Sequence, residues 1–209
     1  MNVIRRGDST SLFFSLDGHG THCAGIVAAV MGNKEGVIGV APEADLYALK
    51  LFSDDGYGYY SDVIKALEWC INTDIQVISM SFGSSYKSGD PGIEPWINDA
   101  YNAGILLVGA AGNEGTWGVV DNVIYPARYA NVIAVAATDS SNRRAIFSST
   151  GPAVELAAPG VNIYSTYWDN RYATLSGTSM ACPMVSGTAA LVIASDPTLT
   201  NTGVRRRVA

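Results

Sequence analysis

Apolar runs and amphipathic segments alternate along this chain. Residues 105–111 and 132–137 are nearly continuous apolar runs, as expected for strands that are covered on both faces. Residues 61–71 and 94–103 instead repeat their apolar positions with the spacing of a helix. The same reading predicts further strands at 45–52, 77–82 and 154–158 and further helical segments at 26–30 and 179–194.

This alternation predicts an α/β fold with a mostly parallel sheet and helices on both faces, in three layers. The chain has 209 residues without a repeat or a linker, so residues 1–209 are expected to form a single domain. Ser61 is predicted to cap the start of one helix, and Gly104 to follow the end of the next. In such sheets, sites form where strand ends meet helix starts.

Composition narrows the function classes. Hydrophobic residues make up 48% of the chain and charged residues only 15%, which is typical of a well-buried globular domain. A net charge of −6 is unsuited to a phosphate backbone, so no nucleic-acid partner is expected. No apolar run approaches the roughly 20 residues that a membrane helix needs, so no membrane partner is expected. The basic run 205–207 is predicted to lie on a solvated helix surface.

Three cysteines, Cys23, Cys70 and Cys182, are too few and too scattered for a disulfide framework. All three have largely apolar neighbours in the sequence. Reduced, buried thiols are therefore expected.

Three glycine-punctuated segments, 17–25, 110–115 and 176–183, place reactive side chains at strand ends and helix starts. Ser179 opens the last long helix, where unpaired N–H groups and the helix dipole can stabilise a developing oxyanion. Asn113 at a strand end can add a second donor. His19, at the start of another helix, can act as a general base. A serine, a base and oxyanion donors are the working parts of acyl transfer.

Other interpretations of these residues are weaker. His19, His22 and Cys23 could form part of a zinc site, but such a site needs four ligands and no second Cys/His pair with suitable spacing follows. The glycines around His19 could open a dinucleotide fingerprint, but position 23 is Cys where that fingerprint needs Gly. His22 is interpreted as a structural histidine packed behind the site. Taken alone, Ser179 would be a helix cap and Asn113 a turn residue.

Together, the three segments resemble the histidine, oxyanion and serine motifs of the subtilases, in that family's order. The resemblance extends from about residue 17 to the end of the chain. It implies a subtilisin-like serine endopeptidase that acts on polypeptide substrates and needs no cofactor for its chemistry. His19 would be the general base, Ser179 the nucleophile and Asn113 the oxyanion donor.

The resemblance also implies how substrate binds. Two edge segments, residues 56–58 and 81–83, would pair with an extended peptide by strand addition. Residues 81–83 and 110–112 would form the two walls of the first specificity pocket, with Ile124 at its base and Glu114 near its mouth. A branched side chain at the base removes volume, so medium-sized or basic side chains are expected to fit better than large aromatic ones. The implied substrate-binding residues are Gly56, Tyr57, Gly58, Ser81, Phe82, Gly83, Ala110, Ala111, Gly112 and Ile124.

The sequence departs from the family before His19. Subtilases carry their catalytic aspartate at the end of an early strand, in a short Asp-Ser/Thr-Gly motif. Here Asp8 is followed by Ser9 and Thr10, and Asp17, two residues before His19, has the place of a turn or capping residue. We therefore expect a core that lacks this early strand and a C-terminal segment.

Two function hypotheses follow. One is an active endopeptidase whose missing strand comes from a separate N-terminal segment or propeptide. The other is an impaired relic or fragment that binds extended peptides. Structural calcium is compatible with the complete protein, although the loop 31–35 only partly resembles the family's calcium loop and no metal ligand is assigned. The resemblance favours an extracellular location for the full-length protein, and an intracellular one stays open.

Overall fold

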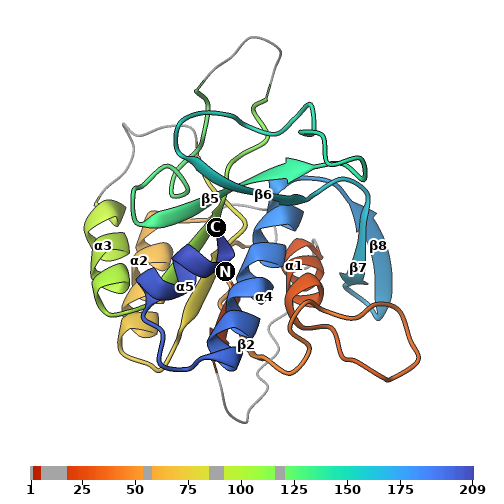
Figure 1. The fold of residues 1–209 in the computed structure, drawn as a ribbon, viewed down its shortest axis with the longest axis horizontal. Helices are drawn as coiled ribbons and strands as arrows, with labels where there is room; N and C mark the ends of the chain where they lie inside the picture. The colour runs from red at the N-terminus through yellow and green to blue at the C-terminus, as the bar shows by residue number, and fades with distance from the viewer. Residues whose placement is uncertain (1, 6–17, 54–57, 85–91, 116–120) are drawn as a thin grey trace.

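The computed structural model describes residues 2–5, 18–53, 58–84, 92–115 and 121–209 (Figure 1). Its elements follow the predicted alternation of strands and helices. In chain order they are β1 (Asn2–Arg5), α1 (His19–Ala28), β2 (Asp45–Ala48), α2 (Tyr60–Ile71), β3 (Val77–Met80), α3 (Ile93–Asn102), β4 (Leu106–Ala110), β5 (Val132–Thr138), β6 (Val154–Pro159), β7 (Ile163–Tyr167), β8 (Arg171–Leu175), α4 (Thr178–Ser195) and α5 (Asn201–Val208).

The main sheet has six strands in the order β2-β1-β3-β4-β5-β6. The pairs β3–β4, β4–β5 and β5–β6 are parallel, whereas β1 runs antiparallel to both of its neighbours. Every residue of β3 and β4 is buried. The structure thus confirms a mostly parallel sheet whose central strands are covered on both faces.

Successive side chains of the central strands serve opposite faces of the sheet. Ile78 and Leu107 belong to the core cluster under α2 and α3. Val77 and Leu106 belong to the cluster that includes residues of α1, α4 and α5. Figure 1 shows α2 and α3 together at one side of the molecule and α1 beside α4 at the other. This is the predicted three-layer arrangement.

Helix α4 is the central helix of its layer. It packs against β3, β4, β5 and β6 and lies beside α1 and α5. By length and composition alone it is apolar enough to cross a membrane, but half of it is buried inside the protein. The core helix of a soluble domain meets the same criteria, so its composition reflects its position over the sheet.

Helix ends agree only in part with the sequence prediction. Gly104 has a φ of 92° directly after the last turn of α3, as predicted for a residue that follows a helix end. The prediction for Ser61 is wrong, because α2 is capped by Tyr59 and Ser61 lies in its first turn. The extended backbone of Tyr59 presents its carbonyl oxygen to the N–H of Asp62 at 3.0 Å without a side-chain cap.

The β7–β8 hairpin was not expected from the sequence. Its strands pair with each other outside the main sheet, and they contain tyrosine, serine and threonine residues instead of forming an apolar run. Asp169 and Asn170, in the turn, both have a positive φ. A turn of this kind favours Asp and Asn, so this pair was the available sequence signal.

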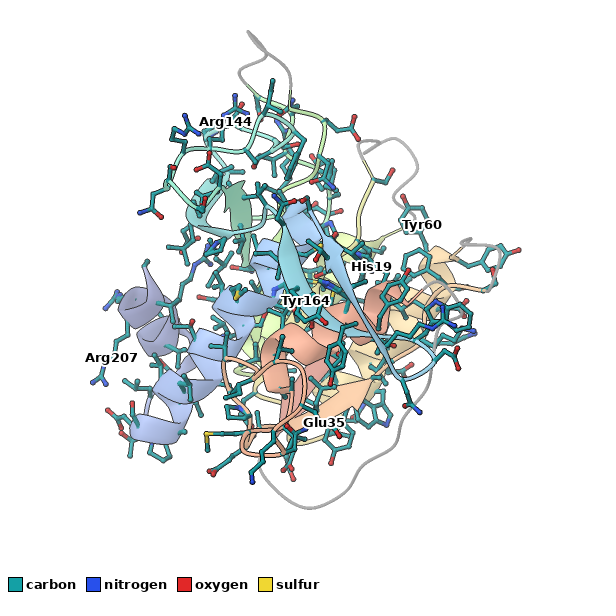
Figure 2. All side chains as sticks on the ribbon, turned by 90° about the vertical axis from the view of Figure 1, so that its right-hand side faces the viewer. His19, Glu35, Tyr60, Arg144, Tyr164 and Arg207 are labelled. Carbon is teal, nitrogen blue, oxygen red and sulfur yellow. The ribbon has the colours of Figure 1, made fainter. Side chains whose placement is uncertain are left out.

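The basic run on α5 is only partly solvated. Figure 2 shows Arg207 pointing away from the body of the protein, where it pairs with Asp196. Arg205 is only partly exposed, because its Nε donates to Glu155 at 2.8 Å and its Nη1 donates to the carbonyl of Ala130 at 3.0 Å. Val204 is buried, so the face of α5 that carries Val204 and Arg205 is turned toward the sheet.

Candidate active site

Ser179 is the second residue of α4 and lies where three segments meet. Its carbonyl oxygen accepts from the Ser81 hydroxyl at 2.9 Å and from the Cys23 thiol at 3.3 Å. Its own hydroxyl donates to the carbonyl of Ser81 at 3.3 Å. The start of α4 is therefore tied both to the segment after β3 and to α1.

His19 is the first residue of α1, directly after Gly18. His19 and Cys23 are one helical turn apart, so both lie on the same face of α1. Because Cys23 reaches the carbonyl of Ser179, this face of α1 is the one turned toward the start of α4. His19 and Ser179 thus stand at the starts of two helices that pack against each other.

Asn113 follows the end of β4 and has a fixed amide orientation. Its Oδ1 accepts from the backbone N–H of Thr178 at 2.9 Å and from the Thr178 hydroxyl at 3.1 Å. With the amide oxygen engaged in this way, Nδ2 remains as the donor. A Cβ at Gly177 would lie 3.5 Å from Nδ2. The donor therefore faces the residues that lead into α4.

Thr178 joins two parts of the candidate site, and the sequence reasoning did not single it out. Its side chain is fully buried, and its hydroxyl accepts from the N–H of Gly112 at 3.1 Å while it donates to Asn113. One hydroxyl thereby joins the end of β4 to the start of α4. The available signal was a hydroxyl side chain at the first position of a helix that begins beside a strand-end amide.

The backbone at the start of α4 supplies a second donor. The first N–H groups of a helix have no intrahelical acceptor and lie at the positive end of its dipole. Thr178 gives its N–H to Asn113, and Met180 gives its N–H to the carbonyl of Gly177. Within the described part of the chain, no hydrogen bond engages the N–H of Ser179. This N–H and Asn113 Nδ2 are the candidate oxyanion donors.

His22 has the structural position that the sequence predicted. It is fully buried, and its Nε2 lies 3.1 Å from the carbonyl of Ile163 and 3.0 Å from that of Ala173. Both partners are acceptors, so Nε2 carries the hydrogen. Nδ1 has no hydrogen-bond partner among the described residues. Burial lowers the pKa of His22, and its bonds to Ala173 and Ile163 oppose this effect. The ring is therefore neutral and packs behind the site.

All three cysteines are buried thiols that form no disulfide bond, as predicted. The thiol of Cys182 donates to the carbonyl of Val108 at 3.5 Å. Burial raises the pKa of Cys182, and it raises the pKa of Cys70 to about 12. Thiols held in this state act as packing groups, because the thiolate is the reactive form.

Ile124 lies between the two segments that were predicted to wall the first specificity pocket. A Cβ at Gly83 would stand 2.6 Å from Ile124 Cδ1, and a Cβ at Gly112 would stand 2.8 Å from Ile124 Cγ2. Ala110 and Ala111 beside them are buried. This placement agrees with Ile124 at the base of a pocket, and the pocket's preference stays a prediction.

An apolar cavity of about 280 Å³ opens beside the two edge segments. Gly58 comes from one segment, and Phe82 and Gly83 come from the other. Phe52 and Phe82 meet there edge to face, with ring centroids 5.7 Å apart. Gly56 and Tyr57, and also Asp8 and Asp17, lie outside the described residues. The remaining lining residues are Leu51, Tyr59, Tyr60, Val63, Ser84, Ile93, Tyr125, Pro126 and Tyr129.

The loop after α1 contains residues 31–35, which only partly resemble the family's calcium loop. In that loop, Asn33 Oδ1 accepts from the N–H of Glu35 at 3.1 Å. The described residues contain no group of three or more His, Cys, Asp or Glu side chains that could hold a metal ion. Because calcium takes about six to eight oxygen ligands, the donors seen in this loop do not fit it by themselves.

This fold defines a class, the subtilisin-like α/β proteins. The chain belongs to the Subtilase family, whose family model matches residues 2–208. Among solved structures, it is similar to the S41 psychrophilic protease at 40% identity and a TM-score of 0.84, covering 92% of this chain and 68% of that one. It is also similar to sphericase, at 38% identity and a TM-score of 0.82, with the same coverage of 92% and 68%.

Named proteases are also similar in sequence to this chain. The thermostable alkaline protease of Halalkalibacterium halodurans is 53% identical over 192 residues, which are 92% of this chain and 51% of that protein. Subtilisin DY of Bacillus licheniformis is 47% identical over 192 residues, which are 92% of this chain and 69% of that protein. The chain thus spans about half the length of the first relative and about two thirds of the second.

Proposed function

We propose that this chain is a serine endopeptidase, which hydrolyses peptide bonds through an acyl-enzyme on Ser179. The observation that carries the proposal is the Thr178 bridge, which holds Asn113 with its amide donor facing the start of α4. Membership of the Subtilase family and protease relatives support the same reaction.

The first step is attack by the Ser179 hydroxyl on the scissile carbonyl. In the resting structure this hydroxyl donates to the carbonyl of Ser81, so it turns from that acceptor toward His19 as the reaction begins. His19 takes the hydroxyl proton and then gives it to the leaving amine. Water then attacks the acyl carbon and loses a proton to His19, and His19 gives this proton to the Ser179 oxygen as the bond between that oxygen and the acyl carbon breaks, which frees the acid product and restores the enzyme.

Negative charge develops on the carbonyl oxygen in both steps. Asn113 Nδ2 and the N–H of Ser179 are the two donors that would hold it. Since Thr178 fixes the amide before substrate arrives, no reorganisation is needed at the moment of reaction. A donor of this kind is worth about 10²- to 10³-fold in kcat, a range measured on subtilisin, a member of this same family.

The substrate would be an extended polypeptide laid between the edge segments that contain Gly58 and residues 81–83. The apolar cavity beside them would take a large apolar side chain on the acyl side of the scissile bond. Ile124 would limit the first pocket to medium-sized or basic side chains. Gly56 and Tyr57 keep their expected role in pairing with the peptide backbone.

The imidazole of a serine protease is oriented by an acidic side chain. Under the first of the two function hypotheses, an aspartate of a separate N-terminal segment or propeptide would perform this task. Structural calcium and an extracellular location are kept as predictions for the full-length protein.

A fluorophosphonate probe and quenched peptide substrates test the proposal together. We expect rapid labelling of Ser179, peptide hydrolysis, and the loss of both in Ser179→Ala, by about four orders of magnitude or more in turnover, a range known from subtilisin of this same family. His19→Ala should slow labelling, whereas Ser176→Ala, a matched serine before the helix, should not. Peptide binding without labelling or hydrolysis would instead favour the peptide-binding relic.

A further inference from the structure

The β7–β8 hairpin is fastened to the helix that begins with His19. The Ser165 hydroxyl donates to the carbonyl of His22 at 2.9 Å, and the Thr166 hydroxyl donates to the carbonyl of Thr21 at 3.0 Å. The His22 ring in turn donates to both hairpin strands. Gly25 permits this close approach, because a Cβ there would lie 2.1 Å from Thr166 Oγ1. The hairpin therefore has a fixed position relative to His19.

Two aromatic residues at the hairpin end lie over the residue before the general base. A Cβ at Gly18 would stand 2.5 Å from the Tyr167 ring and 2.8 Å from the Trp168 ring. Trp168 keeps 37% of its surface exposed. The catalytic reaction requires neither ring. They nevertheless form a partly exposed aromatic wall beside His19.

This wall and the acyl-side cavity lie on different sides of the site. The cavity is lined from α2 and from the segment after β3, and Tyr60 belongs to its lining. The hairpin instead packs on α1. In the view of Figure 2, His19 lies between Tyr60 and Tyr164, a residue of the hairpin. A peptide that runs from the cavity past Ser179 and His19 would therefore leave the site toward the hairpin.

We propose that Trp168, with Tyr167, binds the leaving-group side of the polypeptide substrate and favours a large apolar side chain there. The inference rests on the proposed endopeptidase function and adds to it a second specificity determinant. Aromatic rings attract apolar and aromatic side chains through buried area and ring stacking. Because the hairpin is attached to α1, Tyr167 and Trp168 are held in place before the substrate arrives, which reduces the entropy lost when it binds.

Two kinds of substrate isolate this effect. A peptide nitroanilide has no residue after the scissile bond, whereas quenched peptides can carry Phe or Gly at each of the first three positions after it. We expect the parent chain to prefer Phe over Gly at one of these positions. Trp168→Ala should lower kcat/KM for that Phe peptide by about five- to ten-fold. Hydrolysis of the Gly peptide and of the nitroanilide should stay within about two-fold of the parent.

Tyr164→Ala is the matched control, because Tyr164 is 52% exposed on the same hairpin and is stacked on Tyr172 instead of lying over Gly18. It should preserve the preference for Phe. Equal losses on all three substrates in Trp168→Ala, or no preference in the parent, would overturn the inference.

A binding experiment separates this inference from the proposed function. In Ser179→Ala, calorimetric titration with the Phe and Gly peptides should show tighter binding of Phe, and the added Trp168→Ala change should abolish the difference. If the parent fails to hydrolyse the nitroanilide, the proposed function fails while the titration still decides the role of Trp168. Equal affinity for both peptides in Ser179→Ala would contradict that role.

Discussion

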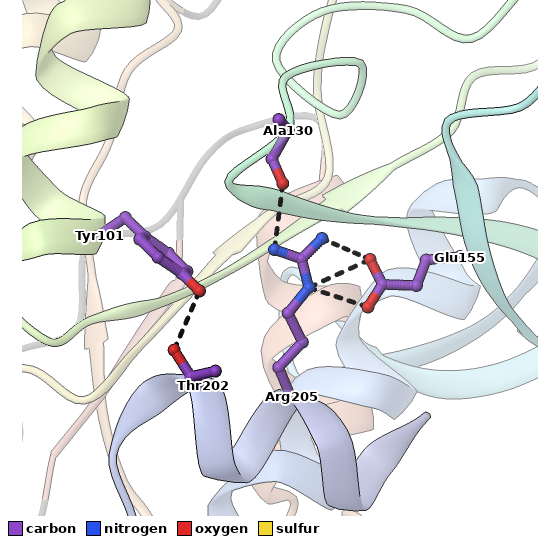
Figure 3. Close-up of polar contacts among 5 residues, drawn as sticks. All are labelled: Tyr101, Ala130, Glu155, Thr202 and Arg205. Atoms are coloured by element: carbon purple, nitrogen blue, oxygen red, sulfur yellow. Dashed lines mark hydrogen bonds and ion pairs between the residues drawn. The ribbon is translucent and has the colours of Figure 1, made fainter.

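The start of α4 and the helix that follows its end, α5, are held by different chemistry. At the start, buried neutral groups are joined by hydrogen bonds, as between Thr178, Gly112 and Asn113. At α5, charged side chains that are partly exposed form ion pairs, as between Arg205 and Glu155 (Figure 3). Both sets of contacts join distant parts of the chain. The contacts at the start of α4 hold the candidate catalytic groups in position, whereas those at α5 are expected to affect stability.

The difference follows from the surroundings of each group. A buried polar atom that loses its partner costs about 1–3 kcal/mol, so each group in the network at α4 restricts where its neighbours can lie. An exposed ion pair contributes about 1 kcal/mol or less, because water competes for both partners. We therefore expect substitutions at the start of α4 to change catalysis, and substitutions on α5 to change only stability.

The largest effect is expected for Thr178→Val, which keeps the shape of the side chain and removes the hydroxyl. Asn113 loses one of the two bonds that fix its amide, and Gly112 loses its acceptor. We expect kcat to fall by about 100-fold with a small change in KM, as for the loss of an oxyanion donor. Steady-state kinetics on a peptide nitroanilide measure both constants, and Thr178→Ser should restore most of the activity.

A double-mutant cycle with Asn113→Ala makes this prediction sharper. If Thr178 acts through Asn113, the valine substitution should cost little once the amide is gone. Fully additive losses in kcat would show that Thr178 affects catalysis by another route. They would also contradict the tight coupling that distinguishes the start of α4 from α5.

A smaller effect is expected at the first specificity pocket. Ile124→Gly removes the side chain that lies between Gly83 and Gly112. We expect the preference for Phe over Leu before the scissile bond to rise by about ten-fold, the usual order for a change of hydrophobic pocket volume. Competition between the two peptides measures the ratio, and Ile38→Gly, at an exposed isoleucine, should leave it unchanged. An unchanged ratio in Ile124→Gly would remove Ile124 from the pocket.

The sequence predicted the regular parts of this fold well, because their signals are local. The buried runs of β4 and β5 and the Gly104 helix end follow from patterns of neighbouring residues. The helical run predicted at 26–30 overlaps only the end of α1, which begins at His19, and α4 begins at Thr178, one residue before its predicted start. The β7–β8 hairpin was missed because its strands pair with each other and bury only part of their residues, which gives no apolar run.

Contacts between distant residues were the harder part of the site. Asn113 and Ser179 stand in recognisable motifs, but the role of Thr178 depends on a strand end 65 residues away in the sequence. The pairing of Arg205 was missed for the same reason, since Glu155 is 50 residues away. A local pattern shows which side chains can form hydrogen bonds, and only the fold shows which partners they meet.

The pH dependence of stability tests the buried position of His22. Burial lowers the pKa of His22 below its ordinary value of 6.5, so the folded protein binds this proton less readily than the unfolded chain. Stability should therefore decrease as the pH falls below about 6.5, with a slope of at most about 1.4 kcal/mol per pH unit for one proton, until the pH passes the lowered pKa.

Urea unfolding between pH 7 and pH 5 should show this contribution in the parent and in His19→Gln. His22→Gln should lack it, because the amide can still donate to the hairpin carbonyls but does not titrate. Parallel pH profiles in the parent and His22→Gln would show that another group is responsible.

The smallest effect is expected on α5. The side chains of Arg205 and Glu155 are 21% and 26% exposed, and Arg205 also donates to the carbonyl of Ala130. Arg205→Gln should therefore cost about 1 kcal/mol, close to the upper limit for an exposed pair, and lower Tm by about 2–4 °C. Arg207→Gln is the matched control, because Arg207 is 52% exposed in its pair with Asp196 and its loss should stay within about 0.5 kcal/mol. Thermal unfolding measures both variants, and each should keep its kcat/KM. A fall in kcat/KM for Arg205→Gln at a temperature where it is fully folded would show that α5 influences the site, because the ion pair lies outside the network around Ser179.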